Sequence, residues 1–531
     1  MINEKRQNKS WYGLGLIFLS SSSWSKLIDY SFFFLQLGFL LAAIGILFRV
    51  WLSKGVQNWC RKQLRLWKLA SKLPGPPALP LIGNALQFAC SLDEILGRIV
   101  ELGKRYGTPL RFWLGPKLVV GLTEPCDIDV ILNSSKAAYK DPVYRFFEQF
   151  IGRGLVTDSG PTHKAHRKAI TRMLNARVLD AYVEYFDRES RCCADHLEKH
   201  VGTGEFEVYP FMEHCTMDII LDTVMGTPGT VQQGDFRNLM EWTGRMYQII
   251  YARMLKVWLH PGWIFACTKY GQQQTTGMKV IHQFTENIIN QKKEEHHALD
   301  RGSIVANRPR LMLLEQLIDH VEKTNLMNDV ELRDEIYTVI LAAQDTTATI
   351  CCFIFLMLGM NLEIQDKVRA ELNEVLGEGN VTTENLPELK YLENVIKETL
   401  RLFPIAPLML RELKGEVDLE TCTLPEGCSV LMAPFLTHRD PKYWDNPDEF
   451  DPNRFTPENS IGRHPYAYVP FSGGLRSCIG QKYAMMCMKT IVANIVRRYH
   501  LTCSTSLDKL RLKTDISIRS VDGYKISITR V

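Results

Sequence analysis

The sequence predicts a mainly helical protein with a minor β portion, built as one large domain behind a single transmembrane helix. Three observations support this prediction. Apolar residues recur with helical spacing over long stretches, β-prone segments are short and few, and a nearly continuous apolar run lies at residues 30–48. Hydrophobic residues make up 46% and charged residues 23% of the 531-residue chain, so we expect a large packed core and no extended disorder.

The apolar run at residues 30–48 reads YSFFFLQLGFLLAAIGILF and is broken only by Gln36, which suits the roughly 20 residues that span a bilayer. Seven basic residues and no acidic residue follow within residues 49–72, and such a cluster normally stays on the cytoplasmic side. A cleaved signal peptide is the alternative, but the run is long and about thirty residues precede it. We therefore expect residues 1–29 to be lumenal and the main domain to face the cytosol, anchored in the endoplasmic reticulum membrane.

Residues 49–80 read as a basic and proline-rich linker, and residues 81–531 as the main domain. The closely spaced prolines of residues 74–80 stiffen the chain and mark the boundary. Basic residues gather beside the apolar run and are not spread over a surface, so we do not expect nucleic-acid binding. Helices are expected at 87–106, 179–200, 328–360, 363–377 and 387–401, and strands at 118–122 and 429–431.

Fourteen cysteines are scattered without CxxC pairs, which favours a reducing compartment and no disulfide framework. One of them lies in an unusual loop, FSGGLRSCIG, at residues 471–480 directly before an apolar helix. Glycines let the backbone pass close to a flat ligand. The following helix N-terminus favours a thiolate, the form of cysteine that ligates iron.

This loop resembles the haem-binding signature of the cytochrome P450 family, Phe-x-x-Gly-x-Arg-x-Cys-x-Gly, at Phe471, Gly474, Arg476, Cys478 and Gly480. The resemblance implies the cytochrome P450 fold, a haem b whose iron is bound by Cys478, and O2 as co-substrate. A guanidinium suits carboxylate oxygens, so Arg476 is expected to pair with a haem propionate. Most lone cysteines are core residues, and only the surrounding pattern distinguishes Cys478 from them.

Residues 336–360 are apolar except for a central polar cluster that includes Asp345 and Thr346. A second transmembrane span is the alternative, but a charged residue at mid-span costs about 2.5 to 3.5 kcal/mol, so we expect a buried core helix. The cluster resembles the family's oxygen-binding helix, which implies that Asp345 and Thr346 relay protons, with Ala343 in place of the usual glycine. Animal members that oxidise fatty-acid chain ends often carry a glutamate at the position of Ala342 that can bond to haem. Alanine cannot, so non-covalent haem is expected.

Glu398 and Arg401 lie three residues apart on a predicted helix, and Arg454 follows later in a Pro-Asn-Arg-Phe segment. A solvated ion pair is the ordinary explanation of such spacing. The resemblance implies instead a buried, structural Glu-Arg-Arg network behind the haem. Asn453 stands where the family often has glutamate, and we expect this departure to change local geometry only.

Further propionate contacts follow from the resemblance. His163 and Arg167 match the family's Trp-x-x-x-Arg helix, with histidine in place of tryptophan but still able to donate a hydrogen bond. Arg411, after a proline-rich turn, is a third candidate.

The resemblance covers about residues 73–531 and is closest to microsomal animal enzymes, insect-like, of the clan that includes fatty-acid hydroxylases. It implies a monooxygenase that inserts one atom of O2 into a lipophilic substrate, with electrons from NADPH through NADPH-cytochrome P450 reductase and with cytochrome b5 as a further partner. Residues 242–265, rich in aromatic side chains, are expected to form a membrane-facing entrance. Four lysines are candidate docking charges for the reductase, namely Lys164, Lys168, Lys482 and Lys489.

Two other functions stay open. A haem-thiolate isomerase or dehydratase would need no reductase, and a haem-binding carrier or sensor would show no turnover. The departures at His163 and Ala343 make the second conceivable, whereas the presence of Asp345 and Thr346 argues against the first. The sequence does not identify the substrate, because one fold hosts many reactions.

Overall fold

The structure is a computed structural model that describes residues 21–234, 236–301 and 312–531. The chain divides into two compact units, with the boundary between Lys68 and Leu69. The first unit contains α1 (Ser21–Leu52) and most of α2 (Lys54–Ala70), so part of the expected linker is helical. The segments Leu35–Val50 and Lys54–Ala70 together have the length and composition of a membrane span, but they are bent by 69°.

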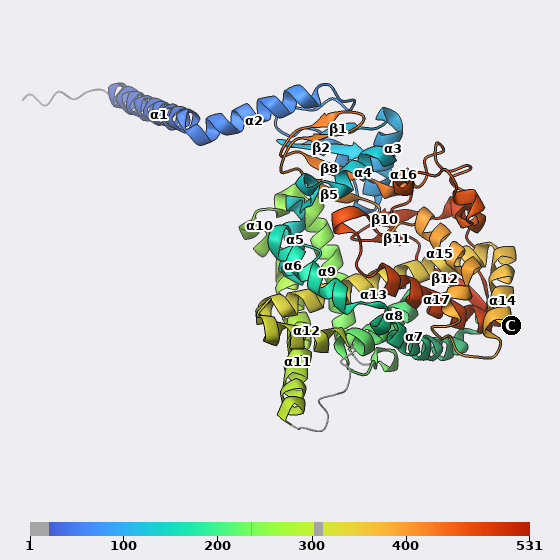
Figure 1. The fold of residues 1–531 in the computed structure, drawn as a ribbon. Coiled ribbons are helices and arrows are strands. Elements are labelled where there is room, and N and C mark those ends of the chain that lie inside the picture. Colours follow the sequence, from blue (N-terminus) through green and yellow to red (C-terminus); the bar gives the residue numbers. More distant parts are fainter. Residues whose placement is uncertain (1–20, 235, 302–311) are drawn as a thin grey trace, which may run out of the picture. The chain divides into compact units, whose positions relative to one another are not determined.

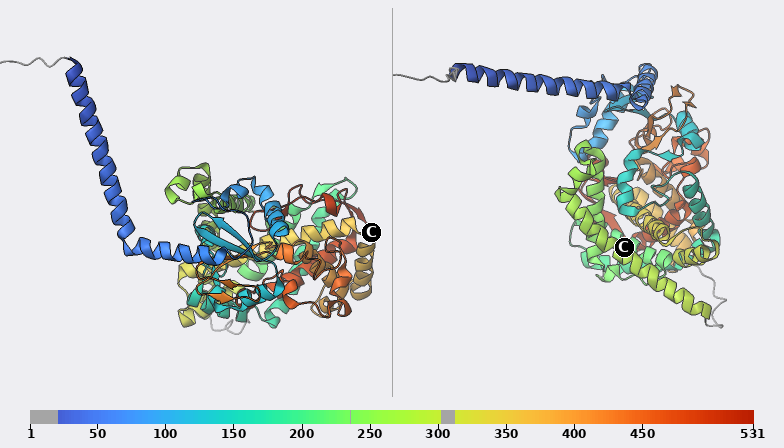
Figure 2. Two further views of the ribbon diagram at one scale, coloured as in Figure 1. Left: turned by 90° about the horizontal axis from the view of Figure 1, so that it is seen from above. Right: turned by 90° about the vertical axis from the view of Figure 1, so that its left-hand side faces the viewer.

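The second unit is mainly helical, as predicted (Figure 1). Its helices are α3 (Ile95–Tyr106), α4 (Pro125–Asn133), α5 (Arg145–Ile151), α6 (Gly160–Met173), α7 (Ala176–Leu197), α8 (Tyr209–Ile220), α9 (Arg237–Leu255), α10 (Gly262–Ala266), α11 (Lys269–Arg301), α12 (Leu313–Thr324), α13 (Asp329–Met360), α14 (Leu362–Leu376), α15 (Lys390–Leu402), α16 (Pro434–Thr437) and α17 (Gln481–Arg498). The long helix α11 runs along the edge of this unit in the right-hand view of Figure 2.

The strands of this unit are short. They are β1 (Leu110–Leu114), β2 (Lys117–Leu122), β3 (Tyr139–Lys140), β4 (Phe206–Glu207), β5 (Met409–Glu412), β6 (Val417–Asp418), β7 (Thr423–Leu424), β8 (Ser429–Met432), β9 (Tyr499–Thr502), β10 (Leu512–Thr514), β11 (Ile518–Ser520) and β12 (Lys525–Arg530). The largest sheet has the order β1-β2-β8-β5-β3, in which only β2 and β8 are parallel. It lies to one side of the helices (Figure 1).

Helix α13 forms the centre of the helical core. It begins where the Asn328 side chain accepts hydrogen bonds from the backbone N–H groups of Val330 and Glu331, while Glu331 accepts one from the Asn328 backbone. Helices α8 and α17 pack against it. Its most apolar window is 78% buried inside the structure, which confirms the predicted core helix.

The helix predicted at residues 87–106 is only partly right. Two short 3-10 turns, Ala85–Phe88 and Leu92–Glu94, precede α3. The Ser91 backbone N–H donates to the Glu94 carboxylate at 3.1 Å, forming a capping box that starts a new helix there. Local capping therefore overrides the apolar periodicity in the first half of the predicted segment.

Candidate haem site

The cysteine loop is fixed by its backbone. The Cys478 N–H donates to the Phe471 carbonyl at 2.9 Å, and α17 begins three residues after the cysteine. Gly474 has a φ of +57°, and a Cβ there would overlap the carbonyl oxygen of Leu132. This glycine is thus required both by its conformation and by the close approach of α4.

The Cys478 side chain is accessible at the surface of the loop. The surrounding protein nevertheless excludes enough water to raise the pKa of its thiol, while the Gly480 backbone N–H and the charge of Arg167 oppose this effect. Burial by the polypeptide thus disfavours the thiolate. A bound metal ion would displace the proton, since thiolate is the ligating form.

Three predicted propionate ligands, namely Arg167, Arg411 and Arg476, lie around this loop. Arg167 Nη2 donates to Ser477 Oγ at 2.9 Å, Arg476 Nη2 to the Asp158 carbonyl at 2.6 Å, and Arg411 Nη1 to the Leu410 carbonyl at 2.9 Å. None of the three forms an ion pair with a described residue.

Burial and the neighbouring cations Arg411 and Arg167 lower the pKa of Arg476 to about 10, and its Nη1 is buried with no partner among the described residues. Buried cations are normally paired. A ligand that brings two carboxylates, such as haem, fits this set of donors.

His163 is buried beside these cations, on the same helix α6 as Arg167. Burial, Arg476 and Arg167 lower its pKa to about 3, so its ring is neutral at physiological pH. A neutral imidazole adds no further positive charge and keeps one N–H to donate. The replacement of tryptophan by histidine thus preserves the donor that the resemblance requires.

The polar cluster of α13 points in two directions. Thr346 Oγ1 donates to the Ala342 carbonyl at 2.7 Å, and both residues are accessible on one face of the helix. Asp345 is buried, and its carboxylate accepts hydrogen bonds from Ser517 Oγ at 2.6 Å and from the Arg519 guanidinium. The two predicted relay residues are therefore adjacent in sequence, but Asp345 is already engaged by the C-terminal segment.

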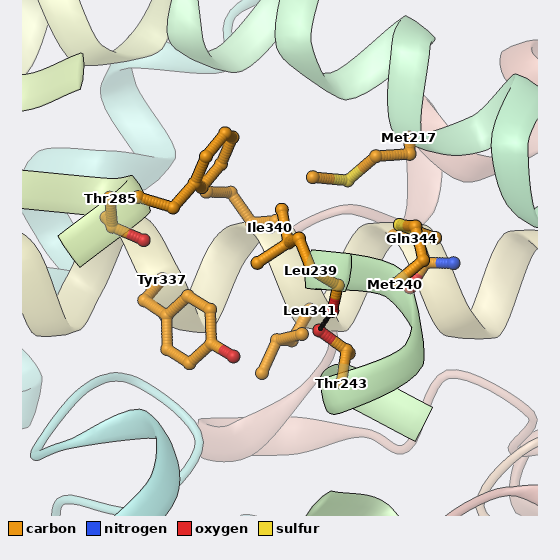
Figure 3. Close-up of a pocket in the computed structure, with 10 residues that line it drawn as sticks. Met217, Leu239, Met240, Thr243, Thr285, Tyr337, Ile340, Leu341 and Gln344 are labelled. Carbon is orange, nitrogen blue, oxygen red and sulfur yellow. Dashed lines mark hydrogen bonds between the residues drawn. The ribbon is translucent and has the colours of Figure 1, made fainter. Parts of the chain in front are cut away.

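A small apolar crevice lies on the opposite side of α13 (Figure 3). It has an empty volume of about 300 Å³, part of which is open to solvent, and it lies between α8, α9, α11 and α13. Gln344 lines it, and two residues correspond to about 200° on a helix, so Thr346 faces the other way. This crevice is separate from the cysteine site.

The predicted network of Glu398, Arg401 and Arg454 is present. Arg401 donates to Glu398 from Nε at 2.7 Å and from Nη2 at 2.8 Å, and Arg454 Nε lies 3.3 Å from Glu398 Oε1. Glu398 and Arg401 are completely buried. Asn453, the departure from the family pattern, donates to Asp451 Oδ1 at 2.8 Å and so stabilises the adjoining turn.

The prediction that Lys489 is a docking charge for the reductase is wrong. Lys489 is 5% exposed, and its ammonium forms an ion pair with Glu393 at 2.6 Å and a hydrogen bond with the Leu386 carbonyl. It lies on the core side of α17 and so cannot meet a partner. The other three lysines, Lys164, Lys168 and Lys482, are exposed.

Sequence reasoning missed the residues that hold Asp345. Ser517 and Arg519 lie 172 and 174 residues further along the chain, and no local spacing signals the contact. It also missed His438, which is buried behind Arg401 and accepts a hydrogen bond from the Val469 N–H at 2.9 Å.

Comparison with known proteins agrees with this geometry. The sequence model of the family described as Cytochrome P450 matches residues 73–526. The chain belongs to the cytochrome P450 family. Members of this family are haem-thiolate monooxygenases, so the protein is an oxidoreductase that uses haem iron and O2.

Its relatives among cytochromes P450 include vertebrate and insect proteins. Cytochrome P450 4V2 of Pongo abelii is 34% identical over 491 residues, covering 90% of this chain and 93% of the relative. Cytochrome P450 4c3 of Drosophila melanogaster is 31% identical over 487 residues, covering 88% and 91%. Both relatives are animal cytochromes P450 whose names begin with the number 4, which agrees with the predicted similarity to animal enzymes.

Proposed function

We propose that this cytochrome P450 inserts one oxygen atom from O2 into a lipophilic substrate, using electrons from NADPH delivered by a membrane-bound reductase. The single observation that supports this best is the set of cations around the Cys478 loop that have no acidic partner among the described residues. Arg167, Arg411 and Arg476 would hold the propionates of a haem b whose iron is bound by Cys478. When bound, the haem supplies the dioxygen chemistry, and the thiolate favours cleavage of the oxygen–oxygen bond.

The remaining site residues position protons and ligands. Thr346 presents its hydroxyl on the accessible face of α13 and holds its proton toward the Ala342 carbonyl. Asp345 accepts hydrogen bonds from Ser517 and Arg519, so a proton that it accepts would weaken its ion pair with Arg519. We propose that this weakening limits proton delivery to the hydroxyl of Thr346.

Asp345→Asn tests the relay. The variant should consume NADPH but form less product per NADPH, because the amide cannot pass a proton in the same way. If the variant forms as much product per NADPH as the parent, Asp345 is not part of the proton relay.

The haem would be held without a covalent bond to the polypeptide. Ala342 is the residue at the position where some animal relatives carry a reactive glutamate, and its methyl group cannot form an ester. Acid extraction with organic solvent should release all haem from the protein. Haem that stays with the polypeptide after this treatment would contradict the proposal.

We also propose a single-pass anchor formed by residues 30–48 in the endoplasmic reticulum membrane, with residues 1–29 in the lumen, residues 49–80 as the link, and the catalytic domain of residues 81–531 in the cytosol. The apolar side chains of residues 35–50 are exposed in the structure, as a membrane-embedded segment requires. Trp258 and Trp263, which are 64% and 75% exposed between α9 and α11, support a membrane-facing entrance there.

The reductase is proposed to dock on Lys164, Lys168 and Lys482, which are exposed on the Cys478 side of the chain, and cytochrome b5 is a second proposed partner. Changing these three lysines together to glutamate should reduce reductase-supported turnover and its sensitivity to salt. Turnover supported by peroxide bypasses the reductase and should stay the same. Equal loss of the turnover supported by reductase and of the turnover supported by peroxide would refute the docking assignment.

The experiment that tests the function is NADPH consumption by the full chain with reductase and a panel of lipophilic substrates, with product analysis. Oxygenated product in amounts that follow NADPH consumption is expected. Conversion of a peroxide without reductase would indicate the isomerase or dehydratase, and haem binding without any turnover would indicate a carrier or sensor.

A further inference from the structure

Helix α8 carries a carboxyl group beside the ion pair of Asp345 and Arg519. The residues Tyr209, Glu213 and Thr216 are spaced by four and then three positions, so they lie on one face of this helix. Helix α8 packs against α13, which carries Asp345. No local spacing marks Glu213, because its neighbours come from α13 and from the C-terminal strand β11.

Contacts at both ends of this face fix its direction. The centre of the Tyr209 ring lies 4.7 Å from the guanidinium carbon of Arg519. One to two turns further along α8, Thr216 Oγ1 lies 3.3 Å from the carbonyl oxygen of Gln344, the residue that precedes the relay aspartate in α13. Glu213 lies between these two contacts, one helical turn from each. Its side chain is therefore directed toward the buried ion pair.

Glu213 is more accessible than the pair that it faces. Its side chain is half-buried, whereas the side chains of Asp345 and Arg519 are only 5% and 12% exposed. The Glu213 carboxylate forms no ion pair with any described residue. Carboxylates that are largely surrounded by protein are normally paired. Glu213 thus offers an unpaired acid that water can reach, next to a cation that is already engaged.

The electrostatics of Glu213 agree with this geometry. Burial and the negative charge of Asp345 raise the pKa of Glu213 to about 7, and the positive charge of Arg519 opposes the shift. Two carboxylates close together resist ionisation of both, so one proton is favoured on the pair. A carboxyl group that titrates near neutrality can release and regain a proton at physiological pH.

The other acids near this face occupy different positions. Asp515, in the turn before β11, lies 3.8 Å from Arg519 Nε and stays beside the guanidinium whichever carboxylate binds it. Glu189 of α7 and Asp218 of α8 accept hydrogen bonds from Gln232 at 3.1 and 2.9 Å, so they are directed away from the relay. Glu213 is therefore the acid on this face that can exchange a proton with the pair.

We propose that Glu213 admits the protons of the relay, by passing a proton through water to Asp345 while Arg519 changes its carboxylate partner from Asp345 to Glu213. Glu213 then regains a proton from solvent and releases Arg519 again. The cation is paired with one carboxylate in both states, so the net charge of the buried group stays constant. The inference rests on the proposed function, in which Asp345 and Thr346 deliver protons.

The overall reaction sets how many protons must pass. One oxygen atom of O2 enters the C–H bond of the substrate, and the other becomes water by taking up two electrons and two protons. The electrons come from NADPH through the reductase, as proposed above. The protons come from solvent, and each turnover therefore draws two protons through Glu213.

The test measures product formed per NADPH by the full-length holoprotein with reductase and the substrate of the lipophilic panel that gives most product. Glu213→Gln keeps the shape of the side chain but carries no transferable proton, so product per NADPH should fall about tenfold, since water replaces a general acid only poorly. Glu184→Gln is the matched control, because Glu184 of α7 is exposed and lies outside the relay. Glu213→Asp keeps a carboxyl group and should recover part of the yield.

Two further readouts separate proton transfer from a structural role. Because the protonated carboxyl of Glu213 is the donor, product per NADPH of the parent should fall as the pH rises, with a midpoint near pH 7. Glu213→Gln should show a low yield without this midpoint. Hydrogen peroxide already contains the two protons and two electrons, so turnover supported by peroxide should be equal in the parent and in Glu213→Gln.

The outcomes are distinct. Product per NADPH of Glu213→Gln equal to that of Glu184→Gln would overturn the proposal. An equal loss of the turnover supported by peroxide would also overturn it, since it would indicate a structural role. If Asp345→Asn leaves product per NADPH unchanged as well, the relay itself is refuted. A parent chain that forms no product with NADPH and reductase would refute the proposed function and this proposal with it.

Discussion

Replacement of Arg401 by methionine should destabilise the catalytic domain more than any other change of a single arginine discussed above. All five N–H donors of its guanidinium have acceptors. Nε and Nη2 donate to Glu398, Nη2 also to the Glu449 carbonyl at 2.9 Å, and Nη1 to the carbonyls of His438 and Pro447 at 2.8 and 2.6 Å. The side chain is completely buried.

The magnitude follows from what methionine would leave behind. Glu398 would keep the Asp451 N–H at 2.9 Å and Arg454 at 3.3 Å, but would lose its bidentate partner. Breaking a buried ion pair costs about 3 to 5 kcal/mol. Three orphaned carbonyl groups add about 1 kcal/mol each at the low end. The sum of about 6 kcal/mol or more is similar to the whole free energy of unfolding of a typical domain, about 5 to 15 kcal/mol.

The assay is denaturant unfolding of purified holoprotein, followed by Soret absorbance and by far-ultraviolet circular dichroism, together with the yield of haem-loaded protein. Arg463→Met is the control. Arg463 is half-buried and lies 4.1 Å from the centre of the Trp444 ring, which Arg401 contacts at 5.2 Å. It donates to the Arg454 carbonyl, so its loss should cost only about 1 kcal/mol. Equal free energies of unfolding for the Arg401 and Arg463 variants would refute the reasoning.

Two further predictions concern the pH dependence of stability and the loading of haem. Burial lowers the pKa of His438 to about 3, whereas the unfolded chain titrates near 6.5, so the unfolded state binds the extra proton between these values. The free energy of unfolding should fall by about 2 kcal/mol from this group alone between pH 6.5 and 5. The His438→Gln variant, though less stable at pH 7.5, should lack that part of the pH dependence. Identical pH dependence of the parent and the variant would contradict the prediction. Gly474→Ala should lower haem loading strongly, because residue 474 has a positive φ and the added Cβ would overlap the Leu132 carbonyl. The control Leu475→Ala changes an exposed side chain and should leave haem loading unchanged. Normal haem loading of Gly474→Ala would show that the loop adapts to the added Cβ.

Features that depend on contiguous sequence could be predicted. The Cys478 loop, the polar break in α13 and the Glu398–Arg401 spacing each lie within ten residues, and the physical requirements of each are local. The burial of α13 also followed from sequence, because a central Asp345 disfavours a membrane. The structure places all three features in one domain.

Features that depend on tertiary pairing could not be predicted. Glu213 faces Arg519 only because α8 packs against α13, and Arg519 reaches Asp345 from 174 residues away. The burial of Lys489 is not visible in the sequence, because lysines are usually exposed and only the ion pair with Glu393 on α15 makes burial possible. Helix α2 lies within residues 49–80, which the sequence predicts as a basic and proline-rich linker.

The most direct test of this account is the reduced carbon monoxide difference spectrum of the full chain and of Cys478→Ser. The parent should show the strongly red-shifted Soret band of a thiolate-bound haem, and the serine variant should lose that band even where it retains haem. A Cys478→Ser protein with the same red-shifted band as the parent would show that another residue binds the iron, which would contradict the assignment of the site.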